Sequence, residues 1–200
     1  MKEAKRPAAR KAAGRKGKPV MKARPKRAPK SAAARPGAPA LKRQYIDLFK
    51  KEFPTTVKVL KAFPPGKDDF RPHERSHSAA RLVHTFAMEN VGAARVARGE
   101  PLDPAALPRP PATYAEAVAA YERGAAELIA AVEEMPDSRL SDEVKFFTGP
   151  GQMGNVPVLD VLWFMLMDSI HHRGQLSVYV RMAGGKVPSI YGPSADEPWR

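Results

Sequence analysis

The chain has 200 residues and no cysteine, which excludes disulfide frameworks, Cys-type zinc sites and a cysteine nucleophile. Its formal net charge of +13 is unevenly distributed, because residues 1–40 carry 14 Lys or Arg and one acid, Glu3. Residues 41–200 hold the other 20 bases and 20 acids and are neutral by count. The longest apolar segment, 156–167, is too short to cross a bilayer before Asp168 interrupts it, so we expect no membrane partner.

Residues 1–40 are predicted to be a disordered basic tail, separate from a single domain at 41–200. The segment consists mainly of Ala, Lys, Arg and Pro, and cannot bury enough apolar surface to offset the entropy lost on ordering. Its composition resembles the tails of linker histones and bacterial histone-like proteins. Such charge density suffices for weak, non-specific nucleic-acid binding by counterion release, whereas a solvated extension is the alternative.

The first half of the domain predicts two helices. From Tyr45 to Phe63, apolar residues recur at intervals of three and four, which indicates an amphipathic helix over 41–63 that Pro54 should kink or divide. A loop at 67–75 leads to a second helix at 76–98, capped by Ser76 or Ser78. His84 lies on an apolar face of this second helix, where a histidine is more often a satisfied core residue than a metal ligand.

Two further helices follow. The capping box that runs from Thr113 to Glu116 predicts a helix over 113–135, after a proline-rich loop at 99–111. A long connection at 138–152, with an extended piece at 144–147, leads to a fourth helix over 157–183 that Asn155 should cap. The first half of this last helix is apolar on every side, so we expect other helices to cover it.

Asp168 and His172 interrupt the fourth helix four residues apart, which puts them on one side of it. A buried carboxylate needs a partner, and either the imidazole or a shared divalent metal would serve. A structural Asp–His pair and a solvated aspartate are the alternatives. His73 and His77 repeat the same spacing, but His73 precedes its helix and His77 lies about 10 Å along the axis from His84, too far for one ion.

The run His-His-Arg-Gly-Gln-Leu at 171–176, followed by Arg-Met-Ala-Gly-Gly-Lys-Val-Pro-Ser-Ile-Tyr-Gly at 181–192, resembles the C-terminal signature of the DinB-like family of small metalloenzymes. The resemblance covers about residues 41–195. It implies an all-α, four-helix bundle with a metal between helices, held by a histidine of the second helix and an H-x-x-x-H pair of the fourth. The implied ligands are His84, Asp168 and His172, with Asp168 in place of a family histidine.

The same resemblance implies a function. We expect a divalent ion (Zn, Ni, Fe or Mn) that activates water or a low-molecular-weight thiol against a small-molecule substrate, as in a hydrolase or a thiol-dependent transferase. Without cysteine, any sulfur nucleophile must come from a cosubstrate. Glu89 could orient a ligand or lie at the surface, and Tyr191 could line the pocket or simply pack. A cytoplasmic, damage-inducible homodimer is expected, and the alternative function is a non-catalytic, stress-related binding protein tethered to nucleic acid by its tail.

Overall fold

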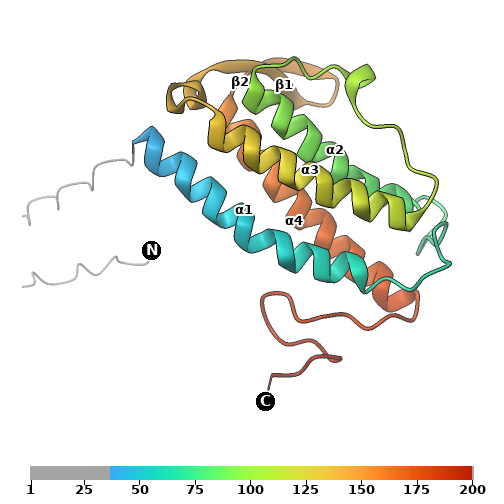
Figure 1. Cartoon of the computed structure of the whole chain (residues 1–200). Coiled ribbons are helices and arrows are strands. Elements are labelled where there is room, and N and C mark those ends of the chain that lie inside the picture. The colour runs from blue at the N-terminus through green and yellow to red at the C-terminus, as the bar shows by residue number, and fades with distance from the viewer. Residues whose placement is uncertain (1–36, 200) are drawn as a thin grey trace, which may run out of the picture. The chain divides into compact units, whose positions relative to one another are not determined.

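The computed structural model describes residues 37–199, and the predicted tail lies outside them apart from its last four positions. The described part contains four α-helices, two short 3₁₀ turns and one β-hairpin (Figure 1). The fold is therefore mostly helical, as predicted, with a small sheet added. In chain order the elements are α1 (Ala38–Lys61), α2 (Ala79–Arg98), η1 (Pro104–Ala106), α3 (Tyr114–Glu134), η2 (Asp137–Ser141), β1 (Glu143–Gly149), β2 (Gln152–Pro157) and α4 (Val158–Met182).

The helices form a bundle in which α1 packs between α3 and α4, and α2 packs between the same two helices on the other side. Lys42 at the start of α1 bonds the carbonyl of Glu133 at the end of α3, while Lys61 pairs with Glu122, so these two helices are antiparallel. At the end of α4, the Tyr179 hydroxyl donates to the carbonyl of His77 just before α2, so α2 and α4 are antiparallel too. The connection 99–113 runs back along the bundle before α3 begins (Figure 1).

Local signals in the sequence set most helix boundaries. The Ser78 hydroxyl accepts from the Arg81 amide at the start of α2, and the Thr113 hydroxyl accepts from the Glu116 amide at the start of α3. Pro54 does not divide α1, which continues through it to Lys61. The proline side chain is exposed there, so water can reach the backbone carbonyl that has lost its donor.

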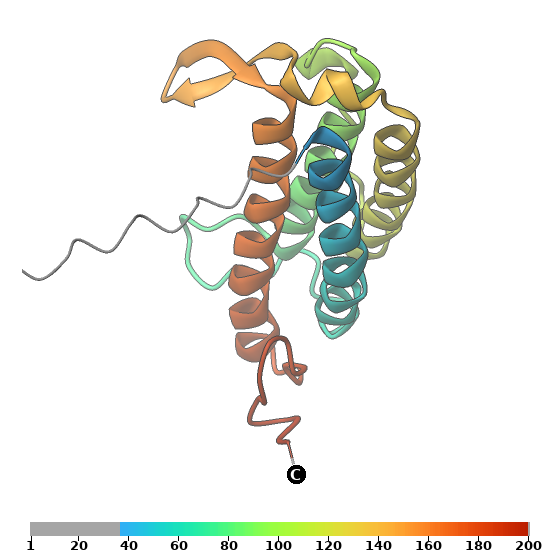
Figure 2. The same ribbon diagram turned by 90° about the vertical axis from the view of Figure 1, so that its left-hand side faces the viewer.

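The connection before α4 is more regular than predicted. Strands β1 and β2 pair antiparallel, and Pro150 and Gly151 form the turn between them. Gly151 has a φ of +68°, the left-handed conformation that the third position of a type II turn requires. The buried Phe146 packs edge-on against Phe164 of α4, with ring centroids 5.3 Å apart, and so attaches the hairpin to that helix. Figure 2 shows the hairpin beside the start of α4.

The fourth helix differs from its prediction in two ways. Pro157 occupies the N-cap position, and Asn155 lies inside β2 instead of capping the helix. Other helices do not cover it on every side, since the side chains of Phe164 and Met167 are 53% and 61% exposed. The reason is geometric, because α4 packs between α1 and α2 and its third side faces outward.

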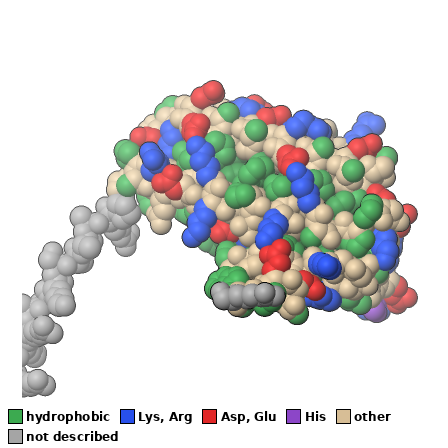
Figure 3. All heavy atoms as spheres, turned by 60° about the horizontal axis from the view of Figure 1, so that its bottom comes forward, with side chains coloured by type: hydrophobic (Ala, Val, Ile, Leu, Met, Phe, Trp, Pro, Cys, Tyr) green, Lys and Arg blue, Asp and Glu red, His purple; other side chains and the backbone are tan. Residues whose placement is uncertain are grey.

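The surface of the described part carries mixed charge. On the face shown in Figure 3, acidic and basic side chains are interspersed around hydrophobic side chains gathered in its middle. Within residues 37–199, no helix combines the length and the apolar character needed to span a bilayer.

Candidate functional site

Three potential metal ligands come together between α2 and α4: Glu89, Asp168 and His172. One ligand atom from each lies within 4.8 Å of the other two. The His172 Nδ1 atom is 3.0 Å from a carboxylate oxygen of Glu89 and 3.8 Å from one of Asp168. The i,i+4 spacing does place Asp168 and His172 on one side of α4, as predicted, and that side faces α2.

Solvent exposure increases across the cluster from Glu89 to Asp168. The side-chain exposure is 9% for Glu89, 18% for His172 and 35% for Asp168, so solvent reaches the group from the Asp168 side. The Ser169 hydroxyl donates to the second carboxylate oxygen of Glu89. Glu89 is thus held at both oxygens, by Ser169 and His172, whereas Asp168 keeps free coordination capacity toward solvent.

Glu89 and His172, the two less exposed members of the cluster, perturb each other electrostatically. Hydrogen bonding to the Glu89 carboxylate raises the pKa of His172, an effect that partial burial opposes. Burial in turn raises the pKa of Glu89, although the contacts with His172 and Ser169 favour its ionised form. A divalent cation entering the cluster would take the place of the His172 proton, so metal binding and protonation compete at this site.

His84 does not join this group. It is separated from Glu89 by five residues, or about 140° around α2, and it points toward the connection 99–113 near the backbone of Pro108. Its side chain is 1% exposed, and neither ring nitrogen completes a hydrogen bond. Burial, assisted by the nearby Arg81 charge, lowers the pKa of His84. The structure therefore brings Asp168 and His172 together with Glu89 and places His84 elsewhere.

Glu89 could have been recognised from one signal. It is the only acidic residue in α2, and it follows Phe86, Ala87 and Met88 in an otherwise apolar turn. Glu89 does not lie at the surface, which was one of the two positions considered from the sequence, because its side chain points into the α2–α4 interface. His73 and His77 remain exposed and belong to no group of three ligating side chains within residues 37–199.

A second polar cluster lies on another side of α4, against α1. The guanidinium of Arg173 is 2.8 Å from a carboxylate oxygen of Glu52 and also donates to the Thr56 hydroxyl at 3.1 Å. Tyr191, from the segment after α4, places its hydroxyl between these charges, donating to Glu52 at 2.7 Å and accepting from Arg173. Tyr191 therefore locks the C-terminal segment to the bundle and does not reach the Glu89 cluster.

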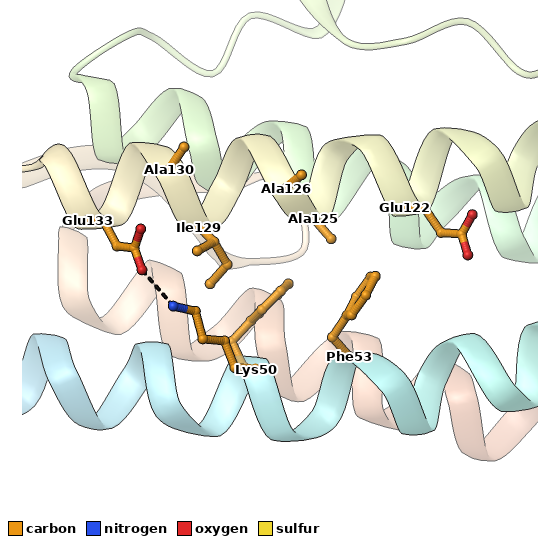
Figure 4. Close-up of a pocket in the computed structure, with 9 residues that line it drawn as sticks. Lys50, Phe53, Glu122, Ala125, Ala126, Ile129, Ala130 and Glu133 are labelled. Carbon is orange, nitrogen blue, oxygen red and sulfur yellow. Dashed lines mark hydrogen bonds and ion pairs between the residues drawn. The ribbon is translucent and has the colours of Figure 1, made fainter.

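A groove between α1 and α3 is a further cavity, with a volume of about 390 Å³ (Figure 4). Its walls are apolar, formed chiefly by Phe49, Phe53, alanines of α3 and Ile129. The Lys50–Glu133 ion pair, at 2.6 Å, lies at one end, and Glu122, which pairs with Lys61, lies at the other. The groove contains no ligating trio, so the chemistry of this chain is better sought at the α2–α4 interface.

Comparison with known proteins agrees with the helical architecture. The DinB superfamily sequence model matches residues 48–176. The chain belongs to the DinB superfamily. The predicted family is thereby confirmed, and the match contains all three residues of the cluster.

One relative is similar in sequence, and two solved structures are similar in fold. YrdA of Bacillus subtilis (strain 168), an uncharacterized protein, is 39% identical over 61 residues, which are 30% of this chain and about a third (34%) of YrdA. The crystal structure of a DinB-like protein of Bacillus subtilis, YjoA, has a TM-score of 0.58 at 21% identity and covers 72% of this chain and 93% of its own. A DinB-like protein of Bacillus cereus has a TM-score of 0.59 at 19% identity, covering 74% and 97%.

Proposed function

We propose that this DinB-superfamily chain is a divalent-metal-dependent enzyme whose ion is held by Glu89, Asp168 and His172. The observation that supports the proposal is the convergence of three ligand atoms from two helices within 4.8 Å, at the partly open edge of the bundle. The predicted set of His84, Asp168 and His172 is retained in part, with the buried carboxylate of α2 in place of the histidine.

The donor set fits such an ion. Two carboxylates offset its charge, and an imidazole beside them suits borderline metals such as Zn, Mn, Fe or Ni. Three protein ligands leave a position for a further molecule, as open catalytic sites require. The exposure of Asp168 identifies the side from which that molecule would arrive. When bound, the ion would supply Lewis-acid chemistry, lowering the pKa of water or of a thiol.

The residues of this chain would prepare and shield the site. Ser169 holds one oxygen of Glu89 and so orients the other toward His172. The Phe86 ring lies 5.9 Å from the His172 ring and separates the cluster from the bundle core. His172 must release its proton before its Nδ1 can bind a cation, so ion uptake would improve as pH rises. Because the chain has no cysteine, either water or the thiol of a cosubstrate would be the nucleophile against a small-molecule substrate.

Metal content tests the proposal. The purified full chain, stripped of metal and then dialysed against Zn²⁺, Ni²⁺ or Mn²⁺, should retain one equivalent of at least one of these ions. The variants Glu89→Gln and His172→Ala should retain none, while His171→Ala, an exposed neighbour, should bind as wild type does.

The His84→Gln variant distinguishes the two ligand sets. We expect it to keep its ion, because His84 lies outside the cluster. If His84→Gln loses the ion and Glu89→Gln keeps it, the ligand set implied by the family resemblance is correct instead. A wild-type chain that retains no ion under any of these conditions would refute the metal-dependent function.

A second function is favoured by the charge distribution of the sequence. Residues 1–40 hold the whole excess of positive charge, so we propose that any nucleic-acid binding resides there. Binding of the full chain to DNA duplex of random sequence should weaken steeply with salt. For each tenfold rise in salt concentration, the logarithm of the association constant should fall by about 0.9 per phosphate neutralised. Residues 41–200 alone should not bind under the same conditions, and equal retardation of both proteins would place the interaction in the folded domain.

A further inference from the structure

The α2–α4 interface that holds the metal cluster continues toward the start of α2. Leu82 and Glu89 are seven residues apart on α2, and Gln175 and Asp168 are seven apart on α4, so each pair lies on one face of its helix. Because the two helices are antiparallel, Leu82 and Gln175 lie at the same level. That level is about 10 Å along the axis from the cluster.

At this level the structure contains a cavity of about 430 Å³. Leu82 and Tyr179, both almost fully buried, contribute its apolar part. Its polar part comes from Arg75 and His77, which precede α2, and from Gln175 of α4. One end of this interface therefore carries carboxylates, and the other end carries hydrogen-bond donors.

The donors in this cavity have spare capacity. Within residues 37–199, the Arg75 guanidinium and the His77 ring have no hydrogen-bond or ion-pair partner, and no carboxylate lines the cavity. The amide nitrogen of Gln175 is 2.8 Å from Nε2 of His171, four residues earlier on α4, while the amide oxygen has no partner within residues 37–199. An unneutralised arginine beside an imidazole and an amide is a suitable receptor for a carboxylate or phosphate.

We propose that this cavity binds the anionic group of a small-molecule substrate whose reacting group lies at the Glu89 cluster. Arg75 and His77 would hold the anion, while Leu82 and Tyr179 would contact the apolar part of the same molecule. Because Arg75 and His77 precede Leu82, on the side away from the cluster, the substrate class is an acid or phosphate ester with more than about 10 Å between its anionic group and its reacting atom. The reacting end rests on the proposed metal function, whereas the anion site itself does not depend on a metal.

The anion site can be tested without metal. The metal-free full chain is titrated with inorganic phosphate, and separately with acetate, at constant ionic strength, while the histidine ring signals are followed by NMR. The His77 signals should shift saturably, and Arg75→Gln should weaken this binding by about tenfold. The matched control is Arg71→Gln, an exposed arginine of the same loop that does not line the cavity. Linear, non-saturating shifts, or equal effects of the two substitutions, would refute the anion site.

The distance between the two ends is tested with a zinc-loaded chain. Calorimetric affinities for dicarboxylates from succinate to sebacate should rise with chain length, because only the longest members approach the separation between the cluster and the cavity. Arg75→Gln should abolish this preference for length. If phosphate binds the metal-free chain but no length preference appears, the anion site is independent of the metal centre and the proposed substrate class is wrong. If no zinc is taken up, the proposed function fails while the phosphate titration still decides the anion site.

Discussion

Two adjacent residues of α4, His172 and Arg173, organise two polar clusters that differ in nearly every physical respect. Arg173 faces α1, is 1% exposed, and has its charge neutralised by the buried Glu52. His172 faces α2, is partly exposed, and shares Glu89 with Ser169 beside the half-open Asp168. The first cluster is buried and its charges are paired, whereas the second is open to solvent and its Asp168 carboxylate can still bind a ligand.

The difference separates a structural role from a chemical one. A buried ion pair with hydrogen bonds to every charged group holds helices in register, but it offers nothing to a substrate. A carboxylate–imidazole group at a solvent edge has a proton that a cation can replace and a free coordination direction. Substitutions in the two clusters should therefore affect different observables.

The largest effect is expected from Arg173→Met. This change leaves the Glu52 carboxylate buried without its partner, and removing one member of a buried pair typically costs about 3–5 kcal/mol. Urea unfolding of the metal-free chain measures the loss. The double variant Glu52→Gln/Arg173→Met should recover much of it, and Arg181→Met, in an exposed pair with Asp196, should leave the midpoint nearly unchanged. A stability loss confined to metal-loaded protein would contradict the structural role of Arg173.

Metal should stabilise the chain only through the other cluster. At an ion concentration about a hundred times Kd, binding to the folded state alone adds about 2.7 kcal/mol to the free energy of unfolding. Thermal unfolding with and without zinc should show this gain in wild type and in Tyr191→Phe, but not in Glu89→Gln. A gain that survives in Glu89→Gln would place the ion elsewhere.

Tyr191→Phe should have a smaller effect than Arg173→Met. It removes one hydroxyl that bonds both Glu52 and Arg173, and a hydrogen bond to a charged group contributes about 1.5–3 kcal/mol, less at a half-exposed position. Limited proteolysis should also cut the segment after α4 sooner, because Tyr191 attaches that segment to the bundle. Ser189→Ala serves as the control, because the two bonds that its hydroxyl makes, to Gly192 and Trp199, both lie within the segment.

The smallest effect concerns pH and contrasts the buried His84 with the partly exposed His172. The pKa of His172 is raised above its usual 6.5, so its pairing with Glu89 stabilises the metal-free fold fully below pH 6.5 and is lost as pH rises through the folded-state pKa. The pKa of His84 is lowered, so its burial penalises the fold as pH falls below 6.5. Unfolding midpoints should be measured between pH 5 and 8. The His172→Gln variant should not show the loss of stability at high pH, and the His84→Gln variant should show a smaller loss of stability at low pH. The reverse pattern would exchange the environments assigned to the two histidines.

Local rules in the sequence determined a large part of this protein. Hydrophobic periodicity and the caps at Ser78 and Thr113 specify the helices, because both act within a few residues of the chain. The spacing of Asp168 and His172 determines that they share a side of α4, since one helical turn separates them whatever packs outside. The signature around residues 171–192 pointed to the family for a similar reason, because its residue types and spacing lie along a continuous stretch of chain.

Tertiary structure alone decided which partner each of these residues meets. Whether Glu89 or His84 faces α4 depends on the rotation of α2 within the bundle, which sequence spacing does not contain. Within residues 37–199, Arg173 is the most buried Lys, Arg, Asp or Glu side chain, and Glu52, 121 positions earlier, lies opposite it and neutralises its charge. The cavity beside Arg75 likewise arises where the loop before α2 meets the last turns of α4. Pairings between distant segments are set by how helices pack, and a single sequence records only the faces that each helix offers.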